Sequence, residues 1–327
     1  MKVCIYGAGA IGGVVGARLA LNGVETSVVA RGPHLAAIRE NGLTIVEPDG
    51  RRTVKVAASD NPADLGPQDY VIAGVKAHQL PAIADMMAPL LHEETAVSYA
   101  VNGIPWWYFH NEGSKWAEHR IEKLDPGGHL WDKIGVDRTI GCVVNLPAEI
   151  IEPGVVHWEG GANRLAFGET DGSKSSRLSA LADAVQASGT ETSIEHPIRY
   201  EVWNKLALIL VSSPIAILTG APPSASVGDP AVREVARKAG LESFAIAAAY
   251  GQKLDRDIDT ILDRWSRAGN HRPSILQDFE AGKAIEIDPQ VTVPLDMAHD
   301  AGVPVPTLDT VAGLMRARAR NAGVHAA

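Results

Sequence analysis

The chain has 327 residues, with 30 Lys and Arg against 39 Asp and Glu, which gives a formal net charge of −9. This acidic balance, without a basic block, argues against a nucleic-acid-binding protein, which needs a Lys/Arg surface to neutralise phosphates. The two cysteines, Cys4 and Cys142, are far apart and form no CxxC pair, so we expect no disulfide framework, no bound metal and a cytoplasmic location.

No stretch of the chain predicts a membrane span. Regularly spaced glycines and Arg18 interrupt the apolar N-terminal stretch, unlike the core of a signal peptide. The later run from Leu206 to Leu218 has about 13 residues and contains Pro214, whereas a span needs about 20. We therefore expect no membrane partner.

Strands and helices are expected to alternate in the first part of the chain. An apolar run, Val3 to Tyr6, meets a glycine-rich turn, a small-residue helix follows through Leu21, and Val24 to Ala30 is a β-branched strand. The next predicted elements are a helix from about Pro33 to Glu40, strands at Leu43–Glu47, Thr53–Ala57 and Tyr70–Val75, a helix at Gln79–Leu91 and a strand at Thr95–Val101. This alternation predicts a parallel sheet covered by helices on both faces.

The pattern then becomes richer in strands before it turns helical. Strands are expected at Ile140–Asn145, Gly154–Trp158, Arg164–Glu169 and Thr192–Ile194, with a helix at Ser173–Ser188. After His196-Pro197 the predicted helices are Ile198–Ser212, Pro230–Tyr250, Ile258–Ala268, Ser274–Ala281, Pro289–Ala301 and Thr307–Arg320. We therefore predict an α/β fold with a Rossmann-type parallel-sheet domain at 1–196 and an all-α domain at 197–327.

A GxGxxG motif stands where the first predicted strand ends and the first helix begins. Its first glycine allows a tight turn, its second lets the backbone approach a pyrophosphate, and its third lets helix and strand pack closely. The helix N-terminus offers N–H groups to the anion. The alternative is a turn of purely structural glycines. The predicted cofactor contacts are Gly7, Ala8, Gly9, Ala10, Ile11 and Gly12.

The end of the second strand favours NADP over NAD. An NAD site carries Asp or Glu about 20 residues beyond the turn, whereas here the strand runs into Arg31. A guanidinium suits a 2′-phosphate, although a solvated loop arginine is the alternative. Lys76, just after the strand Tyr70–Val75, is expected at the same edge of the sheet.

Three polar residues of the helical half are candidates for chemistry. Lys205 follows Trp203 on a helix with a buried face, and taken alone it reads as a surface lysine. Ser274 follows a proline and reads as a helix cap. Glu286 lies between two isoleucines, so we expect a partly buried carboxylate that needs a cation.

Taken together, these residues resemble the ketopantoate reductase (2-dehydropantoate 2-reductase) family over nearly the whole chain. The resemblance implies a Rossmann-type N-terminal domain, a C-terminal domain like that of 6-phosphogluconate dehydrogenase, and catalysis in the cleft between them. The matching pieces are Gly7-Ala8-Gly9-Ala10-Ile11-Gly12, Arg31, Val75-Lys76-Ala77, Asn102-Gly103, Glu201-x-Trp203-x-Lys205-Leu206, and Ser274-x-Leu276-Gln277-Asp278 followed by Glu286-Ile287-Asp288.

The resemblance also implies roles for the site residues. Lys205 is the general acid, and Glu286 is its partner and binds a substrate hydroxyl. Ser274 helps to hold the substrate carboxylate, and Asn102 orients the nicotinamide ribose and the substrate. An ammonium at the ketone oxygen both stabilises the alkoxide charge that hydride transfer builds and supplies the proton.

The chain departs from the family pattern beside Lys205. The family usually has asparagines four and eight residues after the lysine, where this chain has Ile209 and Ser213, and a further asparagine is replaced around Pro223-Ser224. Ser213 remains a candidate substrate contact. Loss of amide donors is expected to disfavour a compact polar hydroxy-keto acid.

The stretch from Ile104 to Val136 is longer than the family's usual connection and rich in aromatic residues. These rings could wall a substrate pocket or form a lid, or they could form a dimer surface or a small satellite core. The aromatic residues concerned are Trp106, Trp107, Tyr108, Phe109, Trp116 and Trp131.

The expected function is therefore the NADPH-dependent reduction of a 2-keto acid, as in the step from ketopantoate to pantoate in pantothenate biosynthesis. One alternative is an opine or β-hydroxyacid dehydrogenase of the same architecture. Another is a nicotinamide-binding sensor without turnover, although binding alone needs neither Lys205 nor Glu286. The partner is a small keto acid, and the assembly considered is a homodimer.

Overall fold

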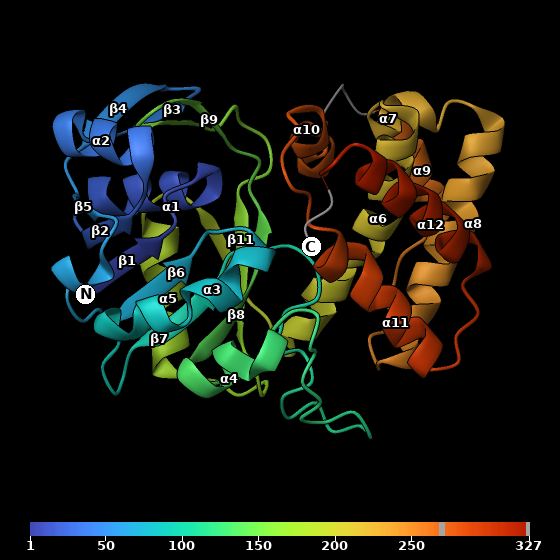
Figure 1. Cartoon of the computed structure of the whole chain (residues 1–327), viewed down its shortest axis with the longest axis horizontal. Helices are drawn as coiled ribbons and strands as arrows, with labels where there is room; N and C mark the ends of the chain where they lie inside the picture. The colour runs from blue at the N-terminus through green and yellow to red at the C-terminus, as the bar shows by residue number, and fades with distance from the viewer. Residues whose placement is uncertain (268–271, 325–327) are drawn as a thin grey trace. The chain divides into compact units, whose positions relative to one another are not determined.

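The computed structural model describes residues 1–267 and 272–324 (Figure 1). The chain folds as two compact units, of which the first comprises Met1–Val101 and Trp106–Ile198 and the second comprises Asn102–Pro105 and Arg199–Ala327. The sequence pattern placed the division at 196, close to the junction after Ile198. It did not indicate that four residues in the middle of the first half, Asn102–Pro105, pack with the helical unit.

The first unit is built on an eight-stranded sheet. In spatial order its strands are β12 (Glu191–Ile194), β11 (Arg164–Glu169), β8 (Thr139–Asn145), β7 (Ala96–Tyr99), β6 (Tyr70–Ala73), β1 (Lys2–Tyr6), β2 (Glu25–Val29) and β5 (Ala57–Ser59). All neighbours are parallel except β8 and β11, so the predicted parallel sheet is confirmed and contains one antiparallel pair. The physical reason is that β8 reaches β11 through two short strands, without the crossover helix that a parallel return needs.

Those two strands belong to a second, four-stranded sheet in the same unit. Its order is β4 (Gly50–Val54), β3 (Leu43–Glu47), β10 (Val155–His157) and β9 (Glu149–Glu152). The sequence did not predict β9, and the strand expected at Thr53–Ala57 is divided between β4 in this sheet and β5 in the larger one.

Helices cover both faces of the large sheet. Successive residues of a strand point to opposite faces, and the face that carries Val3 and Ile5 shares a core with α1 (Ala10–Leu21), α2 (Gly32–Asn41) and α5 (Ser176–Ala187). The helix predicted at Gln79–Leu91 is not continuous. It is divided into two 3₁₀ turns, Ala77–Gln79 and Asp85–Leu90, around α3 (Leu80–Ile83), because Pro81 and Pro89 each remove a backbone donor.

The aromatic stretch packs on the other face of the sheet, within the first unit. Trp106, Trp107, Tyr108 and Phe109 are all buried. Trp106 meets Tyr99 of β7 edge to face, with ring centroids 5.8 Å apart. A Cβ on Gly141 of β8 would come 2.8 Å from Cζ2 of Trp107, so this glycine makes room for the indole. The four side chains therefore form a small satellite core in the first unit. The short helix α4 (His129–Lys133) comes later in the same stretch of chain.

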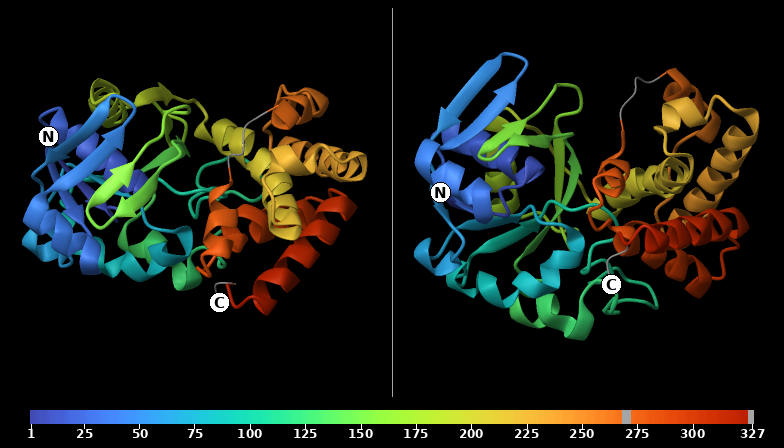
Figure 2. Two further views of the ribbon diagram at one scale, coloured as in Figure 1. Left: turned by 90° about the horizontal axis from the view of Figure 1, so that it is seen from above. Right: turned by 45° about the horizontal axis from the view of Figure 1, so that its top comes forward.

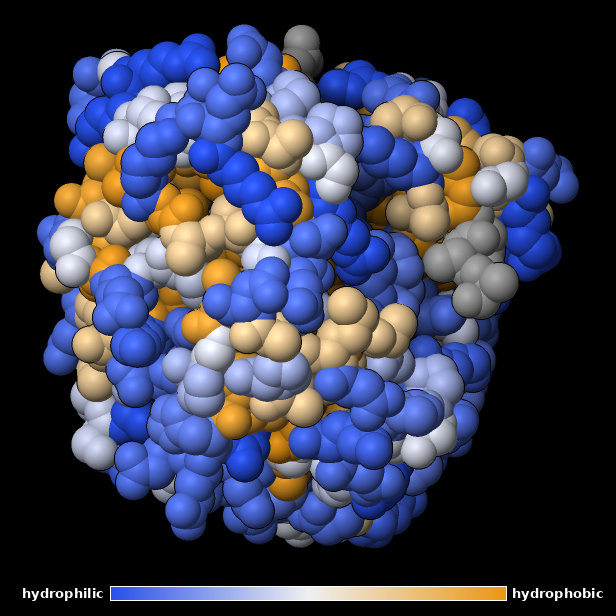
Figure 3. Space-filling view, turned by 60° about the vertical axis from the view of Figure 1, so that its left-hand side comes forward, coloured by the Kyte–Doolittle hydropathy of each residue, from blue (hydrophilic) through white to orange (hydrophobic). Residues whose placement is uncertain are grey.

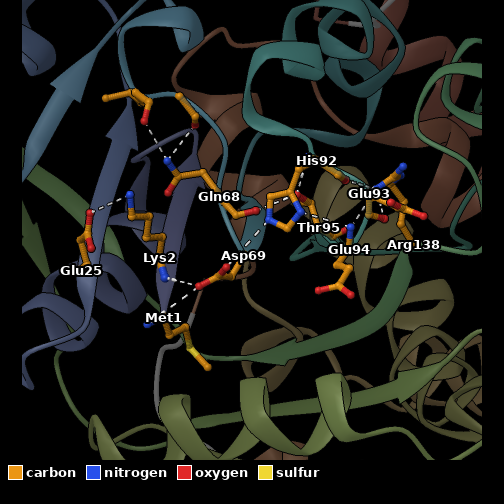
Figure 4. Close-up of polar contacts among 12 residues, drawn as sticks. Met1, Lys2, Glu25, Gln68, Asp69, His92, Glu93, Glu94, Thr95 and Arg138 are labelled. Atoms are coloured by element: carbon orange, nitrogen blue, oxygen red, sulfur yellow. Dashed lines mark hydrogen bonds and ion pairs between the residues drawn. The ribbon is translucent and has the colours of Figure 1, made fainter.

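Polar contacts fix the amino ends of the central strands (Figure 4). The backbone N–H of Lys2 donates to Asp69 Oδ2 at 2.7 Å, and Thr95 Oγ1 donates to the Gln68 carbonyl at 2.6 Å. Arg138, just before β8, donates to the carbonyl oxygens of His92 and Thr95. The opposite edge, at the carboxyl ends of the strands, is where α/β proteins bind ligands.

A buried ion pair joins α1 to the second sheet. Arg18 and Glu47 are 3% and 5% exposed, and Arg18 Nη2 lies 2.8 Å from Glu47 Oε1. The same guanidinium donates to Asn163 Oδ1 at 2.6 Å and to Thr190 Oγ1 at 2.8 Å, and lies 4.7 Å from the ring centroid of Trp158. The arginine that interrupts the apolar N-terminal stretch is thus a buried connection between α1, β3 and the start of β12.

The second unit consists of helices (Figures 1 and 2). They are α6 (Ile198–Thr219), α7 (Pro223–Ser226), α8 (Pro230–Ala249), α9 (Ile258–Arg267), α10 (Ser274–Glu280), a π-helical turn at Asp288–Thr292, α11 (Val293–Asp300) and α12 (Pro306–Asn321). The helix α6 continues past the predicted end at Ser212, through Pro214. The last residue predicted for α9, Ala268, lies outside the described residues.

By length and composition α6 could cross a membrane, but 61% of its most apolar window is buried inside the protein. A core helix meets the same criterion, and the buried face expected for this helix consists of Trp203, Leu206, Leu210 and their neighbours. On the face shown in Figure 3, apolar residues form separate patches among polar ones.

Candidate functional site

The glycine-rich turn lies at the carboxyl edge of the large sheet. The N–H groups of Gly7 and Ala8 both donate to the Val29 carbonyl, at 3.0 and 3.1 Å, which ties the turn to the end of β2. Gly7 has φ +97°, in the left-handed region that favours glycine, and a Cβ there would lie 2.6 Å from Val75 Cγ1. Gly9 is the N-cap of α1 and has no side chain to occupy the first helical N–H groups.

Close packing behind the turn requires further glycines. A Cβ on Gly12 would lie 2.3 Å from the carbonyl oxygen of Gly7 and 2.9 Å from Ile5 Cγ2. Gly74, which the sequence analysis did not single out, faces the same point, because its Cβ would come 3.0 Å from the Gly7 carbonyl oxygen. As a result, the N-terminus of α1 has no side-chain cap and lies close to the backbone at the ends of β1 and β6. The sequence signal for Gly74 was its position, since it is a glycine directly after the strand β6.

Arg31 and Lys76 follow strands that end at this edge. Arg31 is exposed and is the N-cap of α2. Burial raises the pKa of Tyr6 and the positive charge of Arg31 opposes that shift, so the guanidinium lies within electrostatic range of the last residue of β1. Lys76 is half-buried, and its backbone N–H donates to Gln79 Oε1 at 3.2 Å.

His34, in the first turn of α2, connects this helix with the second sheet. Its Nδ1 accepts a 2.9 Å hydrogen bond from the N–H of Gly154, which precedes β10. Burial lowers the pKa of His34 below its ordinary value of 6.5. Sequence reasoning missed His34, since no motif includes it.

We expect His34→Gln to reduce the acid sensitivity of the protein. Because the pKa of His34 is lowered by folding, the unfolded chain binds the proton more readily, and the free energy of unfolding falls as the pH drops below 6.5. Urea titrations at pH 7.5 and at a pH about one unit below 6.5 measure this loss. The exposed histidine variant His78→Gln is the control and should behave like the wild type. An equal loss in His34→Gln and the wild type would contradict the assignment.

In the helical unit, the structure brings two predicted residues together. Lys205 lies on the second turn of α6 and is half-buried, and its Nζ donates to Asn102 Oδ1 at 2.5 Å. The two residues are 103 positions apart in the sequence. The hydrogen bond forms because Asn102–Pro105 pack with the helical unit rather than with the rest of the first half of the chain.

The backbone around Asn102 is fixed against the segment that carries Glu286. The N–H of Ile104 donates to the Pro289 carbonyl at 2.8 Å. Gly103 has φ +96°, and a Cβ there would lie 2.3 Å from the same oxygen, so only glycine fits. Glu286 is 6% exposed, between the buried Ile285 and Ile287, in agreement with the burial expected for it.

The remaining predicted residues lie elsewhere in the same unit. Ser274 is the first residue of α10 and is exposed. Ser213 is buried, 2% exposed, two turns beyond Lys205 on α6, while its neighbour Ser212 is half-buried. Their roles stay predictions. Among residues 1–267 and 272–324, no three His, Cys, Asp or Glu side chains are grouped to hold a metal ion.

Sequence comparison matches both units to one family. The profile of the ketopantoate reductase PanE/ApbA family matches residues 3–172, and that of its C-terminal domain matches residues 197–319. A 2-dehydropantoate 2-reductase of Mesorhizobium japonicum is 39% identical over 327 residues, which cover 99% of this chain and all of that protein.

Solved structures agree with this match. A PanE/ApbA family ketopantoate reductase from Ralstonia eutropha superposes with a TM-score of 0.83 at 27% identity, covering 99% of this chain and 100% of that one. A 2-dehydropantoate 2-reductase from Geobacter metallireducens gives 0.84 at 26% identity, covering 97% and 99%. A D-mandelate dehydrogenase solved with NADH and anilino(oxo)acetate shares the fold, with a TM-score of 0.81 at 21% identity and 99% and 100% coverage. The chain therefore belongs to the ketopantoate reductase family of Rossmann-type oxidoreductases.

Proposed function

We propose that this protein reduces a 2-keto acid to the 2-hydroxy acid with NADPH, and that Lys205 donates the proton. The observation that carries the proposal is the hydrogen bond between Lys205 Nζ and Asn102 Oδ1 in a half-buried setting. It holds an ammonium group at a defined point beside a family-typical asparagine. A member that only bound a dinucleotide would not need this arrangement.

The first unit fits a dinucleotide. Side chains larger than glycine at positions 7, 12 and 74 would fill the space around the turn, and the N-terminus of α1 offers uncapped N–H groups to a pyrophosphate. We assign the pyrophosphate to the turn from Gly7 to Gly12, the 2′-phosphate to Arg31, and a further cofactor contact to Lys76. When bound, the reduced nicotinamide supplies the hydride.

The helical unit supplies the proton and orients the keto acid. As hydride reaches the keto carbon, the carbonyl π electrons move to oxygen, and the Lys205 ammonium stabilises this charge and transfers its proton. Asn102 Oδ1 accepts from Nζ and so fixes the direction in which the remaining N–H bonds point. We assign the orientation of the nicotinamide ribose to Asn102 as well. Glu286 supports the charge of Lys205, while Ser274 and Ser213 contribute hydroxyl contacts.

The test is turnover of NADPH with a panel of 2-keto acids, ketopantoate included. Loss of the reduced-cofactor absorbance is followed with each acid, and the 2-hydroxy acid product is identified by chromatography. Turnover with at least one 2-keto acid is expected. If no acid of the panel is reduced while NADPH still binds, the enzymatic proposal fails and the sensor alternative stands.

We expect Arg31→Ala to weaken NADPH binding while NADH binding changes little. A hydrogen-bonded guanidinium–phosphate contact contributes about 1.5–3 kcal/mol, which corresponds to roughly ten- to one-hundredfold in Kd. Fluorescence titration with both cofactors measures the ratio. The control Arg51→Ala removes another exposed arginine of the first unit and should leave both affinities unchanged. Equal losses for NADPH and NADH in Arg31→Ala would show that Arg31 does not bind the 2′-phosphate.

We also propose a cytoplasmic location. Cys4 and Cys142 are both free thiols and both buried. Burial raises the pKa of Cys4 to about 12, so this thiol stays protonated near neutral pH. Thiols that remain unpaired are typical of proteins in a reducing compartment.

A further inference from the structure

The face of α6 beside Lys205 is unusual for a site that binds polar groups. Most residues of the helix are buried, but a stripe with helical spacing is only half-buried. We call it the Lys205 stripe, and it consists of Lys205, Leu208, Ile209 and Ser212. Beyond the lysine, the first two positions of this partly accessible stripe are therefore apolar, with a large aliphatic side chain at each.

Helix geometry places these side chains next to Lys205. Residues three and four apart on a helix have Cβ atoms about 5–6 Å apart. The Cα–Cβ bonds of a helix lean toward its N-terminus, so Leu208 and Ile209 cover the surface over the turn that carries Lys205. Ser212 lies a further turn away, roughly 10 Å along the axis from Lys205.

The polar groups gather on the other side of Lys205. Asn102 reaches Nζ directly. Asn204, which precedes Lys205, donates its amide to Glu201 Oε1 at 3.2 Å, one turn back toward the helix N-terminus. A keto oxygen held at Nζ thus has polar neighbours toward the start of α6 and aliphatic neighbours toward its end.

We propose that the substrate is a 2-keto acid whose carbon chain beyond the keto group is bulky and apolar, and that Ile209 selects it. This rests on the function proposed above. A hydroxyl group held against Leu208 and Ile209 loses its hydrogen bonds to water and gains none, which disfavours its binding. An aliphatic group at the same place is stabilised because it buries apolar surface.

A pair of substrates that differ in one hydroxyl group tests this directly. 4-Hydroxy-3,3-dimethyl-2-oxobutanoate, which is ketopantoate, and 3,3-dimethyl-2-oxobutanoate share one carbon skeleton. We expect the wild type to favour the second by about tenfold or more in kcat/KM. In Ile209→Asn, which restores an amide at this position, the ratio should move toward the hydroxylated acid by roughly ten- to one-hundredfold.

Two further variants control for effects unrelated to the stripe. Leu314→Asn places the same amide at a 55% exposed leucine of α12 and should keep the wild-type ratio. Ile209→Val keeps an aliphatic side chain and should keep the preference for the apolar acid. The wild-type ratio needs no variant, so the proposal is testable even if Ile209→Asn does not fold.

The outcomes separate the substrate inference from the proposed function. A wild-type ratio below tenfold, or one in favour of the hydroxylated acid, overturns the role of the stripe while reduction of keto acids stands. An unchanged ratio in folded Ile209→Asn also overturns it. Turnover of neither acid overturns the inference as well, and the wider keto-acid panel then decides whether the proposed function survives.

Discussion

Lys205→Ala is expected to lower kcat by about 10²- to 10⁴-fold, the usual contribution of a positioned proton donor. The variant loses the ammonium that the 2.5 Å contact with Asn102 holds in place, and with it both the proton and the charge opposite the developing alkoxide. NADPH affinity should persist, because the residues assigned to the cofactor phosphates, the turn from Gly7 to Gly12 and Arg31, belong to the other unit. Single-turnover kinetics and fluorescence titration separate the two effects.

Lys205→Arg distinguishes charge from proton transfer. Arginine keeps the positive charge but does not release its proton, since its pKa exceeds 12. We therefore expect a rate between those of Lys205→Ala and the wild type. The control Lys253→Ala removes an exposed lysine of the same unit and should leave kcat unchanged. A Lys205→Ala enzyme with the wild-type rate would remove the assigned role of Lys205.

The parts of the fold that follow local rules could be predicted from the sequence. The GxGxxG turn, with a strand before and after its helix, is present as expected. Its glycines stand where a larger side chain would clash with neighbouring atoms or where φ is positive. Strand β11 has the predicted bounds, Arg164–Glu169, since turn residues delimit it on both sides. The burial of Glu286 followed from its isoleucine neighbours.

Features that depend on tertiary packing could not be predicted. The contact of Asn102 with Lys205 needs a four-residue excursion from one unit into the other, and no periodicity marks it. The helix was expected to end at Ser212, but α6 continues through Pro214 to Thr219, because its surroundings bury Ser213 and Ile215 on both sides of the proline. The pairing of β10 with β3 joins segments that are far apart in the sequence. The short exposed strand β9, which pairs with β10, carries little pattern.

Arg18 shows the same limit in a single residue. In the sequence it only interrupts an apolar stretch, yet in the structure it holds Glu47, Asn163 and Thr190 together from the middle of α1. Its partners come from three distant parts of the chain. The Glu47 carboxylate also contacts Arg52, whose side chain is 48% exposed, so one partner of the buried pair lies at the surface.

Glu47→Leu is expected to destabilise the first unit by about 3–5 kcal/mol, because it leaves the buried guanidinium of Arg18 without its counter-ion. The double variant Arg18→Leu/Glu47→Leu should be less destabilised than Glu47→Leu alone, since removal of both charges removes the desolvation penalty. Urea titration of the two single variants and the double variant measures the coupling, expected at about 0.5–3 kcal/mol.

Arg52→Leu serves as the control for this cycle. It removes only the partly exposed partner of Glu47, and exposed ion pairs contribute at most about 1 kcal/mol. If Glu47→Leu were no more destabilising than Arg52→Leu, the buried pair would carry little of the stability of the first unit. If instead the double variant lost the sum of the two single losses, Arg18 would act through Asn163, Thr190 and Trp158 rather than through Glu47, since independent contacts add.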